Sequence, residues 1–340
     1  MKPNRLDCAP TRLTCLLLAI TSGAGCGSGP TAPTDGEGGP RIGSTTVVSE
    51  LGRFPSLSAG RLAYFSIDGN SLVLYDIRTR QGRTVFRPRS DRRVTFHPAI
   101  SRHRIVWAAV NASGSTDIRL YDIEEDSVTV LSDTLNRDAF PSIAGEWAAW
   151  RSSRPGGGTD IEAVNLLTAD MRRVTDDDPI DMQTVVAGGG RVVWSRQVAG
   201  SEEFALVTTQ LETGEIQTLA EAPPSHFEAA TDGERIVWIQ REEQGTNVMV
   251  AELSGRNRRP LTSDAASQVH PDISGRYVVW EVSGEGGGDI VLFDLSTSAS
   301  AVISPSDTDD QNPAIEGRWL AWEEWSAERG VDLVLAQILD

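Results

Sequence analysis

One ten-residue pattern returns seven times along this chain of 340 residues. Most copies open with proline, pass through a small-residue turn that often contains glycine, and close on an aromatic residue. These aromatics are Tyr64, Trp107, Trp150, Trp194, Trp238, Trp280 and Trp322. They are separated by 43, 43, 44, 44, 42 and 42 residues, and a nearly constant period of this length indicates one structural unit repeated along the chain.

Each repeat has a second half in which apolar and polar residues alternate, as in DIRLYDI from Asp117 and DIVLFDL from Asp289. A short run such as SVTVLS follows. Alternation of this kind is typical of half-buried strands, and no segment shows convincing helical periodicity. Four short antiparallel strands in 42–44 residues make one propeller blade. We therefore predict an all-β fold, a seven-bladed β-propeller over residues 45–340.

The two ends of the repeat region predict how the ring closes. The seventh copy has sequence for three strands before Asp340, and the segment Thr45–Val48 stands before the first copy without a unit of its own. We expect this N-terminal strand to complete the last blade, because pairing there removes an open sheet edge.

The pattern P-x-I-x-G-x-x-[VI]-V-W followed by D-I-x-[LV]-[YF]-D-L resembles the TolB-type, WD40-like propeller repeats of bacterial envelope proteins. The resemblance covers residues 45–340 and implies the fold rather than a function. TolB has six blades and a separate N-terminal domain, so its docking role is not carried over. Similar repeats form the propeller of prolyl-oligopeptidase-type peptidases, but no GxSxG motif of their hydrolase domain occurs in this sequence.

The first residues read as an export signal. Lys2, Arg5 and Arg12 precede the apolar run Leu13–Ile20, which is too short to span a bilayer. Small residues before Cys26 resemble a lipoprotein signal, although Gly23 stands where that pattern usually has Leu. We predict a signal peptide over residues 1–25, lipidation of Cys26 and a flexible tether over residues 26–44, rich in Gly, Pro and Ser. Ordinary secretion and an accidental apolar start remain alternatives. The expected location is the cell envelope, facing the periplasm or the cell surface, and Gly27 is compatible with outer-membrane sorting.

Composition narrows the classes of partner and chemistry. With 31 basic and 48 acidic residues the formal charge is −17, which disfavours nucleic acid because phosphates are bound by Lys and Arg. All three cysteines lie within the first 26 residues, so the body contains no cysteine zinc site or nucleophile. The repeated aromatics and the Asp residues before the third strands, such as Asp117 and Asp332, are expected to be structural.

Functional positions are expected where the repeats differ, just before the first strand of each unit, at one mouth of the central channel. The candidate binding residues there are Arg53, His97, Gln183, Glu228, His270 and Gln311. We predict a protein- or ligand-binding scaffold with an envelope protein or a glycan as partner, and we assign no catalytic residue, metal or cofactor. Acidic loops at 175–181 and 306–312 and a basic loop at 87–93 predict a docking face.

Two alternatives remain open. His97, Glu228 and His270 could hold a divalent metal, in a layout that resembles propeller lyases acting on pectic sugars. Carbohydrate binding without turnover is the other alternative.

Overall fold

The structure is a computed structural model that describes residues 39–67, 70–88, 97–221, 228–284, 287–304 and 308–339. The chain divides into two units, Met1–Thr31 and Ala32–Asp340, and every described residue belongs to the second. Cys26, the predicted signal peptide and the basic residues Arg89, Arg92 and Arg93 lie outside the described residues.

Every regular element in the described ranges is a β-strand, which confirms the all-β prediction. Among those same residues no helix has the length and apolarity that crossing a membrane requires.

The strands recur in a fixed order from the centre outward. The innermost strands are β3 (Gly52–Ser58), β7 (Ala99–Ser101), β11 (Arg137–Ala144), β15 (Asp181–Ala187), β19 (Ala229–Thr231), β23 (Ser267–Ser274) and β27 (Asp309–Glu316). The second strands are β4 (Arg61–Ser66), β8 (Arg104–Val110), β12 (Trp147–Ser153), β16 (Arg191–Gln197), β20 (Arg235–Arg241), β24 (Tyr277–Gly284) and β28 (Trp319–Ser326). The third strands are β5 (Ser71–Asp76), β9 (Thr116–Asp122), β13 (Thr159–Asn165), β17 (Phe204–Gln210), β21 (Thr246–Glu252), β25 (Gly287–Asp294) and β29 (Gly330–Leu339). The outer strands are β6 (Gln81–Phe86), β10 (Ser127–Val130), β14 (Met171–Arg173), β18 (Ile216–Glu221), β22 (Arg259–Pro260) and β26 (Ala299–Val302), joined by β1 (Arg41–Ile42) and β2 (Thr46–Glu50).

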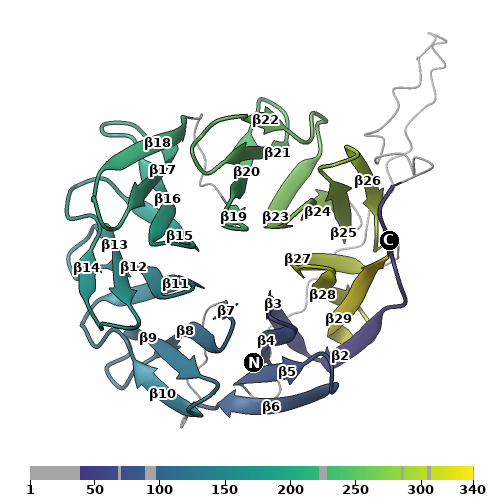
Figure 1. Cartoon of the computed structure of the whole chain (residues 1–340), viewed down its shortest axis with the longest axis horizontal. Helices are drawn as coiled ribbons and strands as arrows, with labels where there is room; N and C mark the ends of the chain where they lie inside the picture. Colours follow the sequence, from purple (N-terminus) through teal and green to yellow (C-terminus); the bar gives the residue numbers. More distant parts are fainter. Residues whose placement is uncertain are drawn as a thin grey trace, which may run out of the picture. The chain divides into compact units, whose positions relative to one another are not determined.

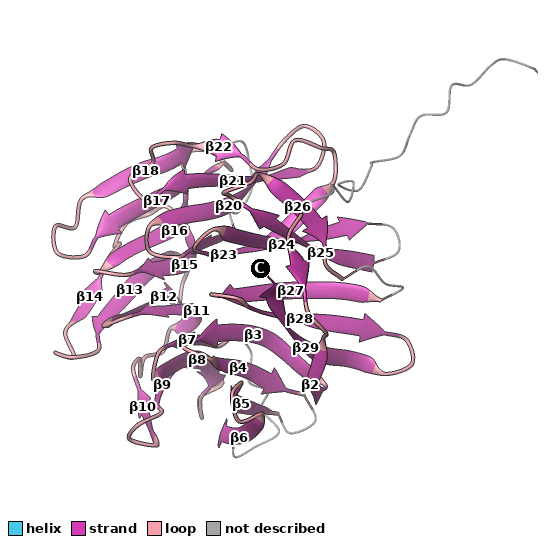
Figure 2. Ribbon diagram, turned by 45° about the vertical axis from the view of Figure 1, so that its right-hand side comes forward, coloured by secondary structure: helices cyan, strands magenta, loops and turns pink. Residues whose placement is uncertain are grey.

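Consecutive strands pair in antiparallel fashion. Four sheets contain four strands each in sequential order, and β7–β14 form one eight-stranded sheet in which a single parallel bridge, Arg137 to Thr116, joins two such groups. The last sheet contains β27, β28 and β29 together with β1 and β2, which both pair with β29. Figures 1 and 2 show these sheets arranged around a common centre, with the innermost strands nearest to it. β1 falls within the segment predicted as a tether.

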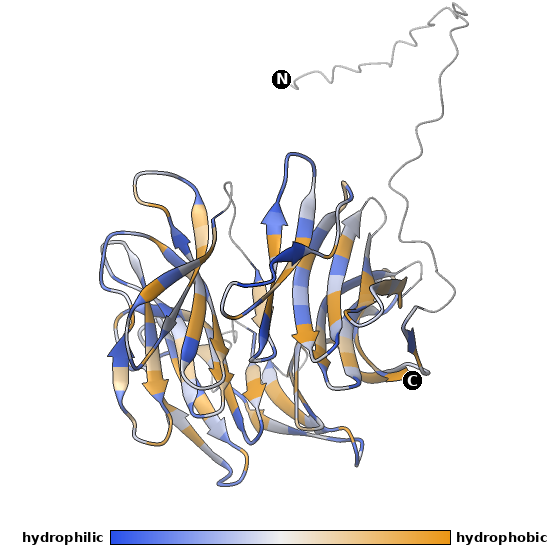
Figure 3. Ribbon diagram, turned by 45° about the horizontal axis from the view of Figure 1, so that its top comes forward, coloured by the Kyte–Doolittle hydropathy of each residue, from blue (hydrophilic) through white to orange (hydrophobic). Residues whose placement is uncertain are grey.

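The repeated aromatics fill the space between neighbouring sheets, as the sequence predicts. Trp107 and Trp150 are completely buried, and Tyr64, at 5 % exposure, is the most accessible of the seven. Trp107 of β8 packs against Leu72 and Leu74 of β5 in the preceding sheet. The alternation of hydrophobic and hydrophilic residues along the strands is visible in Figure 3. Replacing such a buried indole by alanine removes about 3–5 kcal/mol of stability, so these residues hold the sheets together.

Side-chain hydrogen bonds join the innermost strands of adjacent sheets at recurring positions. Ile100 N donates to Ser56 Oγ (3.2 Å), Val186 N to Ser142 Oγ (3.0 Å) and Ile315 N to Asp272 Oδ2 (2.9 Å). At the following turn, Ala59 N donates to Glu316 Oε1 (3.1 Å), which connects β27 to the turn after β3. These bonds fix the spacing of the strands that surround the centre.

Candidate functional site at the central cavity

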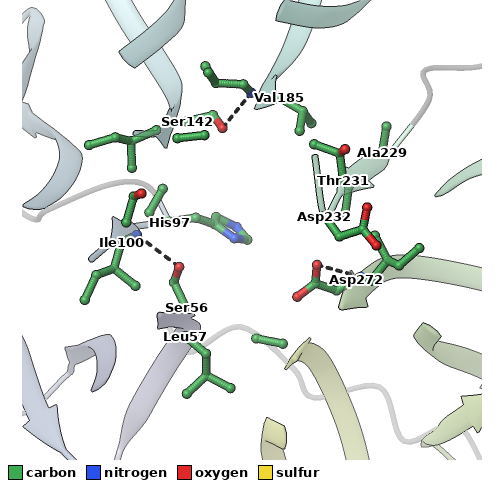
Figure 4. Close-up of a pocket in the computed structure, with 18 of the residues that line it drawn as sticks. Ser56, Leu57, His97, Ile100, Ser142, Val185, Ala229, Thr231, Asp232 and Asp272 are labelled. Atoms are coloured by element: carbon green, nitrogen blue, oxygen red, sulfur yellow. Dashed lines mark hydrogen bonds between the residues drawn. The ribbon is translucent and has the colours of Figure 1, made fainter. Parts of the chain in front are cut away.

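A cavity of about 740 Å³ lies between the innermost strands. We call one end the bulge end, where Phe54, His97, Phe140, Gln183, Glu228, His270 and Asn312 line the wall. The other end, formed by the tight turns after these strands, is called the turn end. Figure 4 shows the His97 ring projecting into the cavity, with Asp232 and Asp272 on the facing wall.

The bulge end owes its shape to an irregularity repeated at the start of the innermost strands. The pairing register shifts in β3, β11, β15, β23 and β27. A residue in each bulge has positive φ: Phe54 (56°), Phe140 (52°), Gln183 (30°), His270 (50°) and Asn312 (51°). Left-handed backbone at a residue with a side chain costs about 1–3 kcal/mol. Bulges re-aim side chains beside functional sites, and these bulge residues line the cavity.

Three carboxylates hold the backbone N–H groups of three bulge residues. His270 N donates to Glu228 Oε2 (2.6 Å), Asn312 N to Glu281 Oε2 (3.3 Å) and Phe54 N to Glu323 Oε1 (2.9 Å). In each case the carboxylate belongs to a different unit from the bulge residue, and for Phe54 it comes from the last unit of the chain. We call Glu228, Glu281 and Glu323 the acidic arc. The arc explains how three of the left-handed bulges are stabilised.

His270 lies between two members of the acidic arc. Its Nδ1 is 2.9 Å from Glu281 Oε2 and its Nε2 is 3.7 Å from Glu228 Oε1. Burial alone would lower the pKa of His270, but the hydrogen bond to Glu281 and the charges of Glu228, Glu281 and Glu323 outweigh burial and raise it above 6.5. The pKa of Glu281 is lowered, because the His270 contacts overcome the effect of its own burial. Both shifts favour an imidazolium–carboxylate pair.

Glu323 is the most buried carboxylate of the arc, with a side-chain exposure of 0 %. Besides Phe54 N it accepts hydrogen bonds from Arg53 Nε (3.0 Å), Asn312 Nδ2 (2.9 Å) and Trp325 Nε1 (3.3 Å). The Arg53 guanidinium in turn lies over the rings of Phe54 (4.6 Å) and Trp325 (4.9 Å). This network makes one side of the bulge end rigid before any ligand arrives.

His97 has the opposite electrostatic environment. Its ring stacks on Phe54 with centroids 4.1 Å apart and projects into the cavity. His97 is solvent-exposed, but the surrounding cavity walls desolvate its ring; this desolvation, followed by the positive charges of His270 and Arg53, lowers the pKa of His97 to about 4. The bulge end therefore contains a neutral imidazole and a second histidine that favours the charged form.

The structure brings together four of the six predicted binding residues. His97, Gln183, Glu228 and His270 line the cavity, whereas Arg53 and Gln311 are absent from the cavity wall. Arg53 contacts Glu323, and Gln311 Nε2 donates to Asp309 Oδ2 at 2.8 Å.

Sequence reasoning missed Glu281 and Glu323. Both directly follow the repeated tryptophan, at a position occupied elsewhere by Phe65, Ala108, Arg151, Ser195 and Ile239. A charge beside a core tryptophan was the available signal, because charged residues are seldom fully buried unless they are paired.

The alternative metal site of His97, Glu228 and His270 does not form a ligand set in the described residues, where no group of three or more His, Cys, Asp or Glu side chains could hold a metal ion. The neighbouring residues His226 and Phe227 lie outside the described ranges.

No family model matches this sequence, and no curated protein does either. Solved structures match it at the level of the fold. The β-propeller domain of the Trilobed protease from Pyrococcus furiosus, described as having an open velcro topology, aligns with a TM-score of 0.67 and 13% identity over 85% of this chain and 97% of that domain. An oligogalacturonate lyase in complex with manganese aligns with a TM-score of 0.66 and 11% identity over 83% of this chain and 86% of the lyase.

The acylaminoacyl peptidase of Pyrococcus horikoshii gives a TM-score of 0.63 and 14% identity over 84% of this chain, which spans about half (51%) of the peptidase. At these identities the comparisons show a β-propeller fold and nothing finer.

Proposed function

We propose that this protein is an exported binding scaffold of the bacterial cell envelope, built as a seven-bladed propeller of TolB-type repeats. Counting the eight-stranded sheet as two blades, because only one bridge joins its halves, gives seven groups of strands. The pairing of β2 with β29 supports closure of the ring by the N-terminal strand. The sequence features around Cys26 support export and a lipid anchor.

The observation that carries the binding role is the acidic arc at the bulge end. Its carboxylates are already oriented by backbone N–H groups, His270 and Arg53, so binding a ligand there requires little reorganisation. The side chains of Phe54 and Phe140 line the same cavity as these polar groups. Concave sites that combine aromatic surface with a few fixed polar groups are typical of ligand recognition. The partner is an envelope protein or a glycan that presents hydrogen-bond donors or cationic groups.

Site-specific photo-crosslinking in intact cells tests this proposal. A photoreactive phenylalanine replaces Gln183 at the bulge end, where the equivalent positions already hold Phe54 and Phe140. The matched control carries the same group at Ala144, at the turn end of the cavity wall. We expect adducts from position 183 and none from position 144. Equal adducts from both positions, or none from either, would refute recognition at the bulge end.

A second candidate function, a metal-dependent polysaccharide lyase or another glycan-active enzyme, is favoured by the two histidines. A metal in such an enzyme would need a further ligand from outside the described residues, which form no ligand set of their own. Groups whose pKa values are displaced in opposite directions can divide the roles of base and acid, and His97 and His270 have such displacements. Metal content by mass spectrometry, with a His97→Ala/His270→Ala double variant as control, distinguishes the candidates. Stoichiometric metal in the wild type that is lost from the variant would favour the enzyme.

A further inference from the structure

Arg151 is a cation without an anionic partner in the described structure. It follows Trp150 on β12, and the only hydrogen bond of its side chain there runs from Nη1 to the sulfur of Met182 at 3.4 Å, which is a weak acceptor. Its Nε is buried and has no acceptor among the described residues. Burial lowers the pKa of Arg151, and no carboxylate among the described residues opposes that shift. Buried or half-buried guanidinium groups are normally paired, so this side chain has unused capacity for an anion.

The repeat shows what is unusual about this position. Glu281 and Glu323 occupy the same place in their units, directly after the tryptophan, and each accepts the N–H of the next bulge residue. The next bulge residue after Arg151 is Gln183, so a donor stands where an acceptor would be expected. Gln183 also has a buried side-chain oxygen, Oε1, with no partner in the described part of the chain, and turning the amide over would place its NH₂ group there as a donor. The bulge end therefore has a polar corner whose hydrogen-bonding groups are unsatisfied.

The corner is fixed in place and borders the cavity. The guanidinium lies over the ring of Phe140 with its carbon 4.7 Å from the ring centroid. Two bulge residues associated with Arg151, Phe140 of its own unit and Gln183 of the next unit, both line the cavity. Arg151 itself is half-buried and is not one of the residues that line the cavity, so a ligand would reach its guanidinium past Phe140 and Gln183. A stacked, planar guanidinium offers two parallel N–H groups, a geometry that matches a carboxylate.

We propose that Arg151 and Gln183 form a carboxylate-binding subsite at the bulge end, facing a ligand whose remaining groups contact the acidic arc. The ligand class is a small molecule or chain end with a free carboxylate, either the carboxyl end of a peptide or a uronic acid. This inference rests on the bulge end being the binding surface proposed above. Glu228, Glu281 and Glu323 disfavour polyanions, so the ligand carries a single carboxylate near Arg151.

Calorimetric titration of the full chain in mild detergent, at pH 7 and low chloride, tests the subsite. Two pairs of probes separate the sources of carboxylate: N-acetyl-alanyl-phenylalanine against its C-terminal amide, and galacturonic acid against galactose. We expect at least one acid to bind more tightly than its neutral partner by on the order of 10-fold or more, since charge-assisted hydrogen bonds give such differences. Equal affinity within both pairs, or no saturable binding of either acid, would overturn the proposal.

Variants tie the effect to this side chain. Arg151→Met should abolish the preference for the acid, and Arg151→Lys should keep part of it. Arg172→Met is the matched control, because Arg172 also stacks on an aromatic ring, Trp147, but its guanidinium donates to the carbonyl oxygen of Leu211. An unchanged preference in Arg151→Met would overturn the assignment. If Arg151→Met fails to fold, anomalous scattering from bromide in wild-type crystals must locate an anion at Arg151. If the wild-type protein shows no preference for the acid while crosslinking at position 183 is intact, the subsite alone is rejected.

Discussion

Removing the Glu323 carboxylate should destabilise the protein far more than removing its neighbour on the same strand. Glu323 is fully buried and accepts four hydrogen bonds, one of them from the Arg53 guanidinium. In Glu323→Ala the guanidinium loses its carboxylate, and the bulge residue Phe54 loses the acceptor for its N–H. Breaking a buried ion pair on one side costs about 3–5 kcal/mol, and the 29 % exposure of the Arg53 side chain places this pair in the lower part of that range. For a domain of this size that corresponds to a fall in Tm of about 5–10 °C.

Differential scanning calorimetry at pH 7 measures this effect, with Glu324→Ala as the control. Glu324 is an adjacent β28 residue whose partner Arg329 is 56 % exposed, and exposed pairs contribute only about 0–1 kcal/mol. Glu323→Gln should fall between the two variants, because one acceptor oxygen remains and the added NH₂ group faces donors. A Tm for Glu323→Ala equal to that of Glu324→Ala would refute the claim that the acidic arc supports the bulge.

Three further predictions concern ionisation and backbone geometry. In an NMR titration, the His97 ring should titrate near pH 4 and the His270 ring above 6.5. Because the pKa of His270 is raised on folding, its contribution to stability is present below pH 6.5. That contribution is lost as the pH rises through the pKa of His270 in the folded protein. Burial raises the pKa of Asp181 to about 6, so the stability contributed by its protonated form is lost as the pH rises through 6. Asp181→Asn should therefore raise the urea midpoint at pH 7, with a gain of up to about 3 kcal/mol in the free energy of unfolding. At pH 4 the gain should be much smaller. A lower midpoint for Asp181→Asn at pH 7 would contradict this. Gly190→Ala should lower the urea midpoint of the protein more than Gly145→Ala does. Both glycines have positive φ, so the backbone strain is similar. The added methyl group at position 190 would lie 3.0 Å from the indole nitrogen of Trp147, whereas at position 145 it would meet open space.

The repeat predicted the fold because its period and alternation are local properties of the chain. The spacing of the aromatics set the length of a unit, and Trp107 and its equivalents are buried between sheets as expected. The same reasoning placed His97, Glu228 and His270 at the cavity wall, because it aligned units on their first strand. In the fourth unit the glycine turn is longer by one residue, and the left-handed bulge residue there is Gln183.

The acidic arc could not be found from periodicity, because its bonds connect different units. Glu281 and Glu323 stand in register with Val269 and Gln311 on their own sheets, but their carboxylates reach the N–H groups of Asn312 and Phe54 in the next sheet. Which backbone groups need an acceptor depends on where the bulges occur. A sequence pattern reports residue type and spacing, and it contains no direct record of a register shift.

The bulges also explain why charge is unevenly distributed around the cavity. A bulge leaves a backbone N–H outside the regular ladder, and a buried N–H needs an acceptor. The chain supplies this acceptor from the position after tryptophan in two units, Glu281 and Glu323, and from Glu228, the residue before β19, in a third. Where Arg151 takes the position after tryptophan, that acceptor is replaced by a donor. One repeated backbone requirement thus produces an acidic side and a cationic corner at the same end of the cavity, and this asymmetry gives the bulge end its capacity to orient a polar ligand.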